Sequence, residues 1–208
     1  MQISLSSIGI EKGRQYETII TTANPDGTKN AAPIGVLCVN EDTILCRIFK
    51  GGKTLDNILN QKEFTSNITK NPELFTLSTL GNLPQDCFGD DDSIKNIEAY
   101  FKCEVIDFKE AVKQSDPIKK KGEAIVIKSK VVKLVINKQI DALNRSFGYV
   151  VETLANLTRF DMVDEDTQQH YLQQFREARR VVNKVGYKKE KEAMDKIKKE
   201  LIKKGYEP

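Results

Sequence analysis

The feature that most constrains the fold of this chain is a single change of hydrophobic period at about Asn137. Before it, short runs rich in β-branched and aromatic residues alternate with turns. After it, apolar residues recur at three- and four-residue steps, as in amphipathic helices. This order predicts an α+β protein, with a β domain over residues 1–137 and a helical region over residues 138–208.

The β domain divides into short strands. Strand-like runs cover residues 16–22, 31–39, 43–49, 63–69, 74–80, 97–105 and 124–136. Residues 24–27 (Asn-Pro-Asp-Gly) predict a hairpin turn, because proline presets φ and glycine accepts the left-handed conformation. Residues 53–59 have helical spacing and follow two glycines, so a short helix is predicted there. Polar composition predicts loops over residues 81–93 and 109–122.

Three helices are predicted after Asn137. The second runs from about Asp166 to a C-cap at Gly186, and the third carries Met194, Ile197 and Leu201. For the first helix, the spacing predicts a buried stripe consisting of Ile140, Leu143, Phe147, Val150 or Val151, Leu154 and Leu157.

The charge and residue inventory excludes several classes of protein. The net charge of +3 lies wholly in residues 186–208, with eight lysines and five acids, so residues 1–185 sum to zero. A basic surface for nucleic acid is therefore not expected. Four scattered cysteines and a lone histidine, His170, predict buried thiols and no metal site. With no long apolar run and no signal-peptide pattern, we expect a cytoplasmic protein without a membrane segment.

A candidate phosphate site lies in residues 47–55 (Arg-Ile-Phe-Lys-Gly-Gly-Lys-Thr-Leu). This stretch places Arg47 near a strand end, two glycines in a turn, and Lys53 and Thr54 at a helix start. A helix N-terminus offers free N–H groups and partial positive charge, to which the ammonium and hydroxyl groups add. The alternative is an ordinary turn before a solvated helix, and the stretch does not match the Walker A pattern.

A second candidate feature is the run Ala31-Ala32-Pro33-Ile34-Gly35 within a predicted strand. Small residues, a proline and a glycine weaken a strand unless another group approaches its backbone. A flat ligand would be such a group, and a bulge or an edge strand is the alternative. Asn67 and Thr69 end the next strand, and their polar groups are expected to reach the same pocket.

These motifs together resemble an archaeal family of uncharacterised flavoproteins, known as domain of unknown function 447. The resemblance is carried by residues 16–22, 26–36, 47–57 and 67–69, and it continues through residues 144–159. The family belongs to the FMN-binding split-barrel superfamily, which includes flavin reductases and pyridoxamine-phosphate oxidases. The resemblance therefore implies a split β-barrel with a C-terminal helical region.

The resemblance also implies a cofactor and its ligands. FMN would lie at a homodimer interface, with its phosphate near Arg47, Lys53 and Thr54. Its ring would lie against the backbone of Pro33, Ile34, Gly35 and Val36, with Asn67 and Thr69 near the ribityl chain or the ring. From the residues alone, another phosphorylated ligand such as pyridoxal phosphate fits equally well. This chain has Gly52 where a serine-like residue is expected, so one hydroxyl contact to phosphate is missing.

Two functions follow from a bound flavin. The first is an FMN-dependent oxidoreductase of the flavin reductase kind, with a reduced nicotinamide or deazaflavin as electron donor and an unidentified substrate. The alternative is a non-catalytic flavin carrier or redox sensor that acts through a partner. The sequence contains no Ser-His-Asp, Cys-His or paired-carboxylate pattern, so no catalytic residue is assigned. Arg145, Glu152 and Arg159 recur every seven residues, as a solvated charge ladder or a face that meets the flavin pocket.

Overall fold

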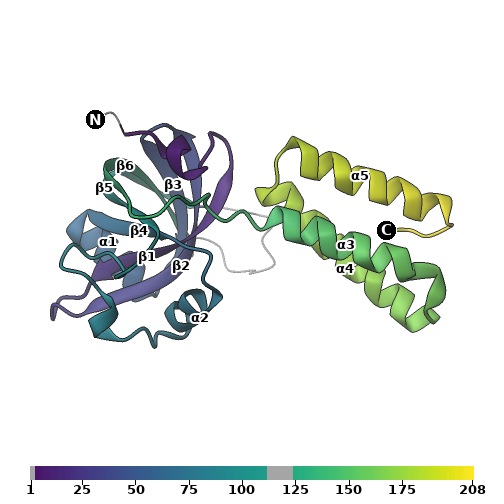
Figure 1. The fold of residues 1–208 in the computed structure, drawn as a ribbon, viewed down its shortest axis with the longest axis horizontal. Coiled ribbons are helices and arrows are strands. Elements are labelled where there is room, and N and C mark those ends of the chain that lie inside the picture. Colours follow the sequence, from purple (N-terminus) through teal and green to yellow (C-terminus); the bar gives the residue numbers. More distant parts are fainter. Residues whose placement is uncertain (1–2, 112–123) are drawn as a thin grey trace. The chain divides into compact units, whose positions relative to one another are not determined.

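The computed structural model describes residues 3–111 and 124–208, and within them six antiparallel strands close into a barrel in the order β1-β2-β3-β6-β5-β4 (Figure 1). The strands are β1 (Gln15–Ala23), β2 (Lys29–Asn40), β3 (Thr43–Phe49), β4 (Glu63–Ile68), β5 (Ala99–Ala111) and β6 (Ala124–Ile136). The first three form a meander, and the turn at Gly27 has the left-handed φ of 83° that the hairpin motif requires. The predicted α+β barrel is confirmed.

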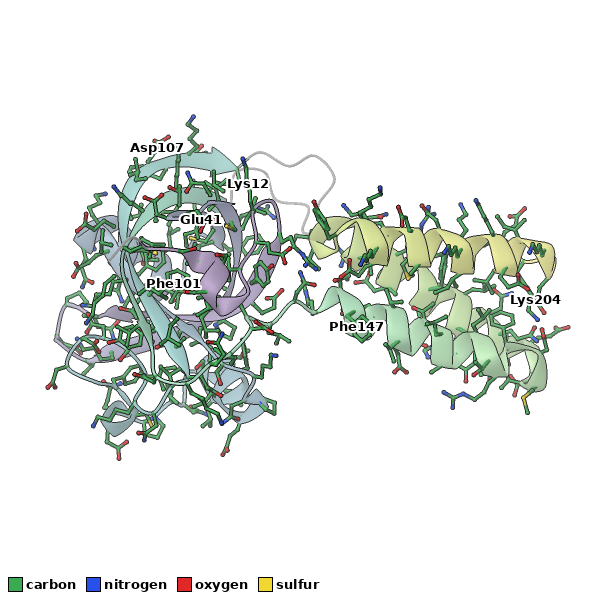
Figure 2. The ribbon with its side chains drawn as sticks, turned by 45° about the horizontal axis from the view of Figure 1, so that its top comes forward. Lys12, Glu41, Phe101, Asp107, Phe147 and Lys204 are labelled. Atoms are coloured by element: carbon green, nitrogen blue, oxygen red, sulfur yellow. The ribbon has the colours of Figure 1, made fainter. Side chains whose placement is uncertain are left out.

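The barrel interior is filled by alternate residues of the strands. Ile20, Val36, Phe101 and Ile127 are fully buried there, and Figure 2 marks Phe101. Helix α1 (Lys53–Gln61) adds Leu55 and Ile58 to the same core cluster. Among the cysteines, three are buried free thiols (Cys38, Cys46 and Cys103), and Cys87 is partly exposed.

One predicted strand is a helix. Residues 74–80 belong to α2 (Pro72–Leu80), so the strand prediction for them was wrong. The helix begins because the Asn71 side chain accepts a hydrogen bond of 2.9 Å from the N–H of Glu73, with Pro72 in the first turn. It ends at Gly81, whose φ is 72°. These local end signals outweigh the strand-like composition between them.

The connections around the barrel include the 3-10 turns η1 (Leu5–Ile8) and η2 (Gln85–Cys87), and the helical unit includes the 3-10 turn η3 (Phe160–Met162). Residues 81–98 otherwise form a connection between α2 and β5, as predicted for residues 81–93. Of the loop predicted over 109–122, residues 109–111 belong to β5, and the remainder lies outside the described residues.

The chain forms two compact units, Met1–Leu143 and Asn144–Pro208. The stretch that follows β6 stays with the barrel, because the N–H of Glu17 donates to the carbonyl of Leu143 at 2.8 Å. Neither described part of the chain contains a helix long and apolar enough to span a membrane.

The second unit consists of α3 (Ser146–Arg159), α4 (Glu165–Val185) and α5 (Lys188–Lys203), which pack against one another. Its core cluster comprises Val150, Phe160, Leu172, Phe175, Ala178, Val182, Met194, Ile197 and Leu201. The three predicted helices are present, but the inward stripe of the first was partly wrong. Ile140 and Leu143 precede α3, and Phe147 and Leu154 are exposed at its surface.

Candidate functional site

The strands β2 and β3 of the closed barrel are paired over only part of their length. Their pairing runs from Asn40↔Thr43 to Val36↔Cys46, and the next residues on the two strands are Gly35 and Arg47. Beyond that point, β3 pairs only with β6, and β2 pairs only with β1, as far as Lys29 of β2. Within the described residues, the segment of β2 from Lys29 to Gly35 is therefore paired on one side only.

The free side of this segment presents backbone groups to a ligand. The backbone groups of even-numbered residues of β2 form their hydrogen bonds with β1. For example, the N–H of Cys38 donates to the carbonyl of Arg14 at 3.0 Å. By the alternation of an antiparallel ladder, the N–H and C=O groups of Ala31 and Gly35 point to the open side. Pro33 contributes a carbonyl there and no N–H. The sequence signal of a small, proline-containing strand thus coincides with a strand that is open along one edge.

Gly35 has a specific steric reason to be glycine. A Cβ on this residue would lie 2.3 Å from Nε2 of Gln15, so the Gln15 side chain lies directly over the Gly35 backbone. Ile34 and Val36 face the barrel core, where Val36 is fully buried and Ile34 partly so. Gly35 has no side chain of its own, but the Gln15 side chain covers its outward face, so a ligand has to approach Gly35 along the open edge of the strand, where its N–H and C=O groups point.

Helix α1 begins beside this open edge with an uncapped N-terminus. Gly51 has a φ of 87°, and Gly52 is the N-cap, which supplies no side-chain hydrogen bond to the first turn. The N–H groups of an uncapped first turn are available to an anion. Lys53 is exposed at the helix start, and Thr54 is buried directly behind it.

Thr54 is held in a network of amides and hydroxyls that joins α1 to the barrel. Nδ2 of Asn30 donates to Oγ1 of Thr54 at 2.8 Å, and Nδ2 of Asn57 donates to Oγ1 of Thr22 at 3.0 Å and Oδ1 of Asn24 at 2.9 Å. Because Oγ1 of Thr54 accepts from Asn30, the hydroxyl proton is left to be donated elsewhere. The network fixes Thr54 as a hydrogen-bond donor at the helix N-terminus.

A cavity of about 390 Å³ lies next to this network, within the range of about 300–1,000 Å³ typical of small-molecule sites. Its wall comprises Asn24, Thr28, Lys29, Asn30, Ala31, Lys53, Gly81, Leu83, Gln85 and Phe88. The wall thus combines polar groups and two lysines, Lys29 of β2 and Lys53 of α1, with apolar side chains from the connection after α2.

A second cavity of about 380 Å³ shares Asn24, Thr28 and Lys53 with the first, and its wall also contains Asp26 and Asp56. Hydrogen bonds from the hydroxyl and the N–H of Thr28 lower the pKa of Asp26, and the charge of Lys53 lowers it further. Two carboxylates make this second cavity less suited to an anion than the first. A phosphate would therefore favour the side of Lys53 that faces Asn30.

The wall formed by the connection after α2 is attached to β2 by Gln85. Its Nε2 donates to the carbonyl of Lys29 at 2.8 Å, and its Oε1 accepts from the N–H of Lys29 at 2.7 Å. The side-chain amide thereby takes the place of a neighbouring strand at the end of the open edge. The Lys29 ammonium forms an ion pair with Asp92 from the same connection.

Asn67 and Thr69 have structural partners of their own. Nδ2 of Asn67 donates to the carbonyl of Ile19 at 2.9 Å and to Oγ1 of Thr21 at 3.0 Å, and its Oδ1 accepts from the N–H of Ile94 at 2.8 Å. Oγ1 of Thr69 accepts from the N–H of Asn71 at 3.1 Å. Neither residue lies on the wall of the 390 Å³ cavity.

The predicted site residues are thus brought together in part. Lys53 lies on the cavity wall, Thr54 is bonded to the wall residue Asn30, and Gly35 and Arg47 flank the opening of the strands. The Arg47 guanidinium lies 5.0 Å from the ring centroid of Phe49 on the same strand. Gln85, Leu83 and Phe88 were not predicted, because nothing in their local sequence distinguishes them from other loop residues.

Two family models match this chain. The N-terminal domain of a protein family of unknown function, DUF447, matches residues 16–138, and a second DUF447 model matches residues 144–199. The FMN-bound protein MM1853 from Methanosarcina mazei, itself matched to DUF447, is 29% identical and superposes with a TM-score of 0.53. That comparison covers 94% of this chain and 98% of the other.

More distant structures share only part of the chain. The flavin reductase PheA2 is 18% identical, with a TM-score of 0.44, over 61% of this chain and 83% of its own. The flavoredoxin from Methanosarcina acetivorans is 16% identical, with a TM-score of 0.45, over 60% of this chain and 70% of its own. The two family matches together cover most of the sequence, from the first barrel strand to the last helix. This chain belongs to the DUF447 family.

Proposed function

We propose that this protein binds FMN and acts as a flavin-dependent oxidoreductase of the flavin reductase kind. The observation that carries the proposal is the position of Thr54, whose hydroxyl is fixed by Asn30 at an uncapped helix N-terminus beside a 390 Å³ cavity. The M. mazei relative aligns over 94% of this chain and is FMN-bound, which supports the choice of ligand.

In this proposal the phosphate of FMN is held at the start of α1. The N–H groups of the first turn and the Thr54 hydroxyl donate hydrogen bonds, and Lys53 supplies positive charge. Arg47 adds a second cation from the end of β3. These groups form charge-assisted hydrogen bonds without help from a side chain at Gly52, so the missing serine-like hydroxyl does not exclude a phosphate.

The open edge of β2 is proposed to hold the flavin ring. The N–H and C=O groups of Gly35, with the carbonyl of Pro33, can pair with the polar edge of a planar ring in the way that a strand pairs with its neighbour. Ile34 and Val36 keep that edge in place through the barrel core. For Asn67 and Thr69 we propose an indirect role, in which they position the connection that carries Leu83, Gln85 and Phe88.

When bound, FMN would supply the hydride chemistry. The residues of this chain would bind, orient and shield it: Lys53, Thr54 and Arg47 at the phosphate, and the β2 backbone at the ring. The sequence of the barrel unit contains no histidine. We assign no protein side chain as an acid, base or nucleophile. We propose that the protein is a cytoplasmic homodimer that holds FMN at the interface between its subunits. A reduced nicotinamide or a reduced deazaflavin would be the electron donor to this FMN.

Two experiments test the proposal at separate levels. Titration with FMN, followed by quenching of flavin fluorescence, should give saturable binding with one FMN per chain; no binding would contradict the cofactor assignment. Anaerobic addition of NADH, NADPH or reduced deazaflavin should then bleach the bound flavin. If FMN binds and none of these donors reduces it, the reductase activity is wrong and a carrier or sensor function replaces it.

A further inference from the structure

The two cavities beside α1 meet at Lys53, and their walls differ in charge. Among the described residues, the wall of the cavity of about 390 Å³ contains two lysines, Lys29 and Lys53, and no acidic residue. Asp92, which forms an ion pair with Lys29, does not belong to that wall. The wall of the cavity of about 380 Å³ contains Lys53 as its basic residue, with the acidic residues Asp26 and Asp56. The electrostatic potential therefore becomes more negative from the first cavity to the second.

A chain of hydrogen bonds fixes the carboxylate of Asp26 at the second cavity. Nδ2 of Asn57 donates to Oδ1 of Asn24 at 2.9 Å, and Nδ2 of Asn24 donates to Oγ1 of Thr28 at 2.9 Å. The hydroxyl and the N–H of Thr28 then donate to Oδ1 of Asp26, at 2.6 Å and 3.0 Å. These two bonds, followed by the charge of Lys53, lower the pKa of Asp26. Asp26 is therefore ionised and held in one orientation at neutral pH.

Asp56 places a second carboxylate next to Lys53. It follows Lys53 by three residues on α1, so the two side chains are neighbours on the helix surface. Both are exposed, and both belong to the wall of the second cavity. The other polar groups on that wall are uncharged amides and a hydroxyl, from Asn24, Thr28, Asn57 and Asn60. An anionic group that enters this cavity thus meets two carboxylates, with Lys53 as the counter-charge on the wall.

FMN and FAD differ in where they place negative charge relative to Lys53. A phosphomonoester such as that of FMN carries about −1.5 to −2 charges at pH 7 on a single group. In the proposed site, this group lies at the Thr54 hydroxyl and the N–H groups of the first turn of α1. In FAD the same phosphate is joined to a second phosphate, which leads on to adenosine. Because the flavin half would occupy the first cavity and the open edge of β2, the second phosphate of FAD would extend into the second cavity.

We propose that Asp26 and Asp56 make the site selective for FMN over FAD. Both carboxylates repel the second phosphate of FAD, whereas the terminal phosphate of FMN stays on the other side of Lys53. Size is not the selecting property, because a cavity of about 380 Å³ lies in the range that accepts small molecules. The inference rests on the proposed function, since it names which flavin the same site accepts.

Calorimetric titration of the full chain with FMN and with FAD tests this selectivity. At low ionic strength the parent should bind FMN at least about ten-fold more tightly than FAD. In the double variant Asp26→Asn, Asp56→Asn, this ratio of dissociation constants should fall at least about five-fold, mainly because FAD binds more tightly. Asparagine at position 26 keeps an oxygen that accepts from Thr28. The matched control is Asp90→Asn, Asp107→Asn, at two exposed positions outside both cavity walls, and it should keep the ratio of the parent.

The salt dependence of the ratio separates charge from shape. Raising the NaCl concentration from about 0.05 M to about 0.5 M should reduce the preference of the parent for FMN, because salt screens exposed charges, and should change the ratio little in the double variant. A preference that persists in high salt and in the double variant would be steric and would overturn the proposal. Equal binding of both flavins by the parent would overturn it while leaving the FMN site intact. Failure to bind either flavin would overturn the proposed function itself, and this inference with it.

Discussion

Nδ2 of Asn30 on β2 donates a hydrogen bond of 2.8 Å to Oγ1 of Thr54 at the start of α1. This bond connects the open edge of the barrel to the uncapped helix end, the two elements to which we assign the ring and the phosphate of FMN. It also determines what the Thr54 hydroxyl can do, because an oxygen that already accepts from an amide presents its proton to the next acceptor.

Replacing Thr54 with valine should weaken FMN binding without unfolding the protein, because valine keeps the shape and removes the hydroxyl. A hydrogen bond to a charged group contributes about 1.5–3 kcal/mol. Since about 1.4 kcal/mol corresponds to a ten-fold change, the dissociation constant should rise roughly 10- to 100-fold. Thr54→Ser is the matched control and should bind nearly as the parent does. Equal affinities of the valine variant and the parent would refute the role of the hydroxyl.

The double variant Arg47→Ala, Lys53→Ala should lose FMN while its far-ultraviolet circular dichroism stays that of the parent. Both side chains are cations placed near the proposed phosphate, and removing both leaves the helix N-terminus and Thr54 alone to hold a dianion. The control is Lys12→Ala, Lys128→Ala, at two exposed lysines away from the cavity. Retention of FMN by the first variant after gel filtration would show that the phosphate is bound elsewhere.

Asn67→Ala should destabilise the barrel, because it leaves the carbonyl of Ile19 and the N–H of Ile94 without their partner in a fully buried position. An unsatisfied buried group costs about 1–3 kcal/mol, so the free energy of unfolding in urea should fall by at least about 2 kcal/mol. Asn60→Ala, at an exposed position on α1, should change it little. Equal losses in the two variants would mean that Asn67 does not anchor the connection.

The acid stability of the barrel should depend on Asp91. Partial burial raises its pKa, but hydrogen bonds from Tyr100 and Ser93 outweigh that effect, so the pKa is about 2 in the folded protein. Its value in the unfolded chain is about 3.9. A carboxyl with a depressed pKa stabilises the fold above the unfolded value and loses that contribution as the pH falls through the folded value.

Asp91→Asn should therefore flatten the dependence of unfolding free energy on pH between about 4 and 2. The measurement is a series of urea unfolding curves across that range, with Asp86→Asn, on the same connection, as the control. An unchanged pH dependence in Asp91→Asn would show that its hydrogen bonds do not persist in solution.

Most strand positions in the barrel could be predicted from the sequence because β-branched and aromatic residues are concentrated in each strand, between turn residues. The helix α2 was missed because its interior resembles a strand, and the end signals at Asn71 and Gly81 decide its structure. The orientation of α3 was missed for a different reason. Its most apolar stripe, with Phe147 and Leu154, lies on the surface, and a pattern shows that a face is apolar without showing what covers it.

Within the site, the sequence could indicate residues that act through their local backbone, such as Lys53 and Thr54 at a helix start. It could not indicate Gln85, whose two hydrogen bonds reach the backbone of Lys29 far away in the chain. The partners of Asn67 are similarly remote, on β1 and on the connection before β5. Such roles arise from the closed barrel and have no local signature.

The most direct test of the central claim is the absorbance spectrum of the purified full-length protein, with any ligand released by heat identified by its mass. We predict the bands of an oxidised flavin and the mass of FMN, in the protein as purified or after incubation with FMN and gel filtration. A protein that is colourless in both cases would contradict the assignment of this site to FMN.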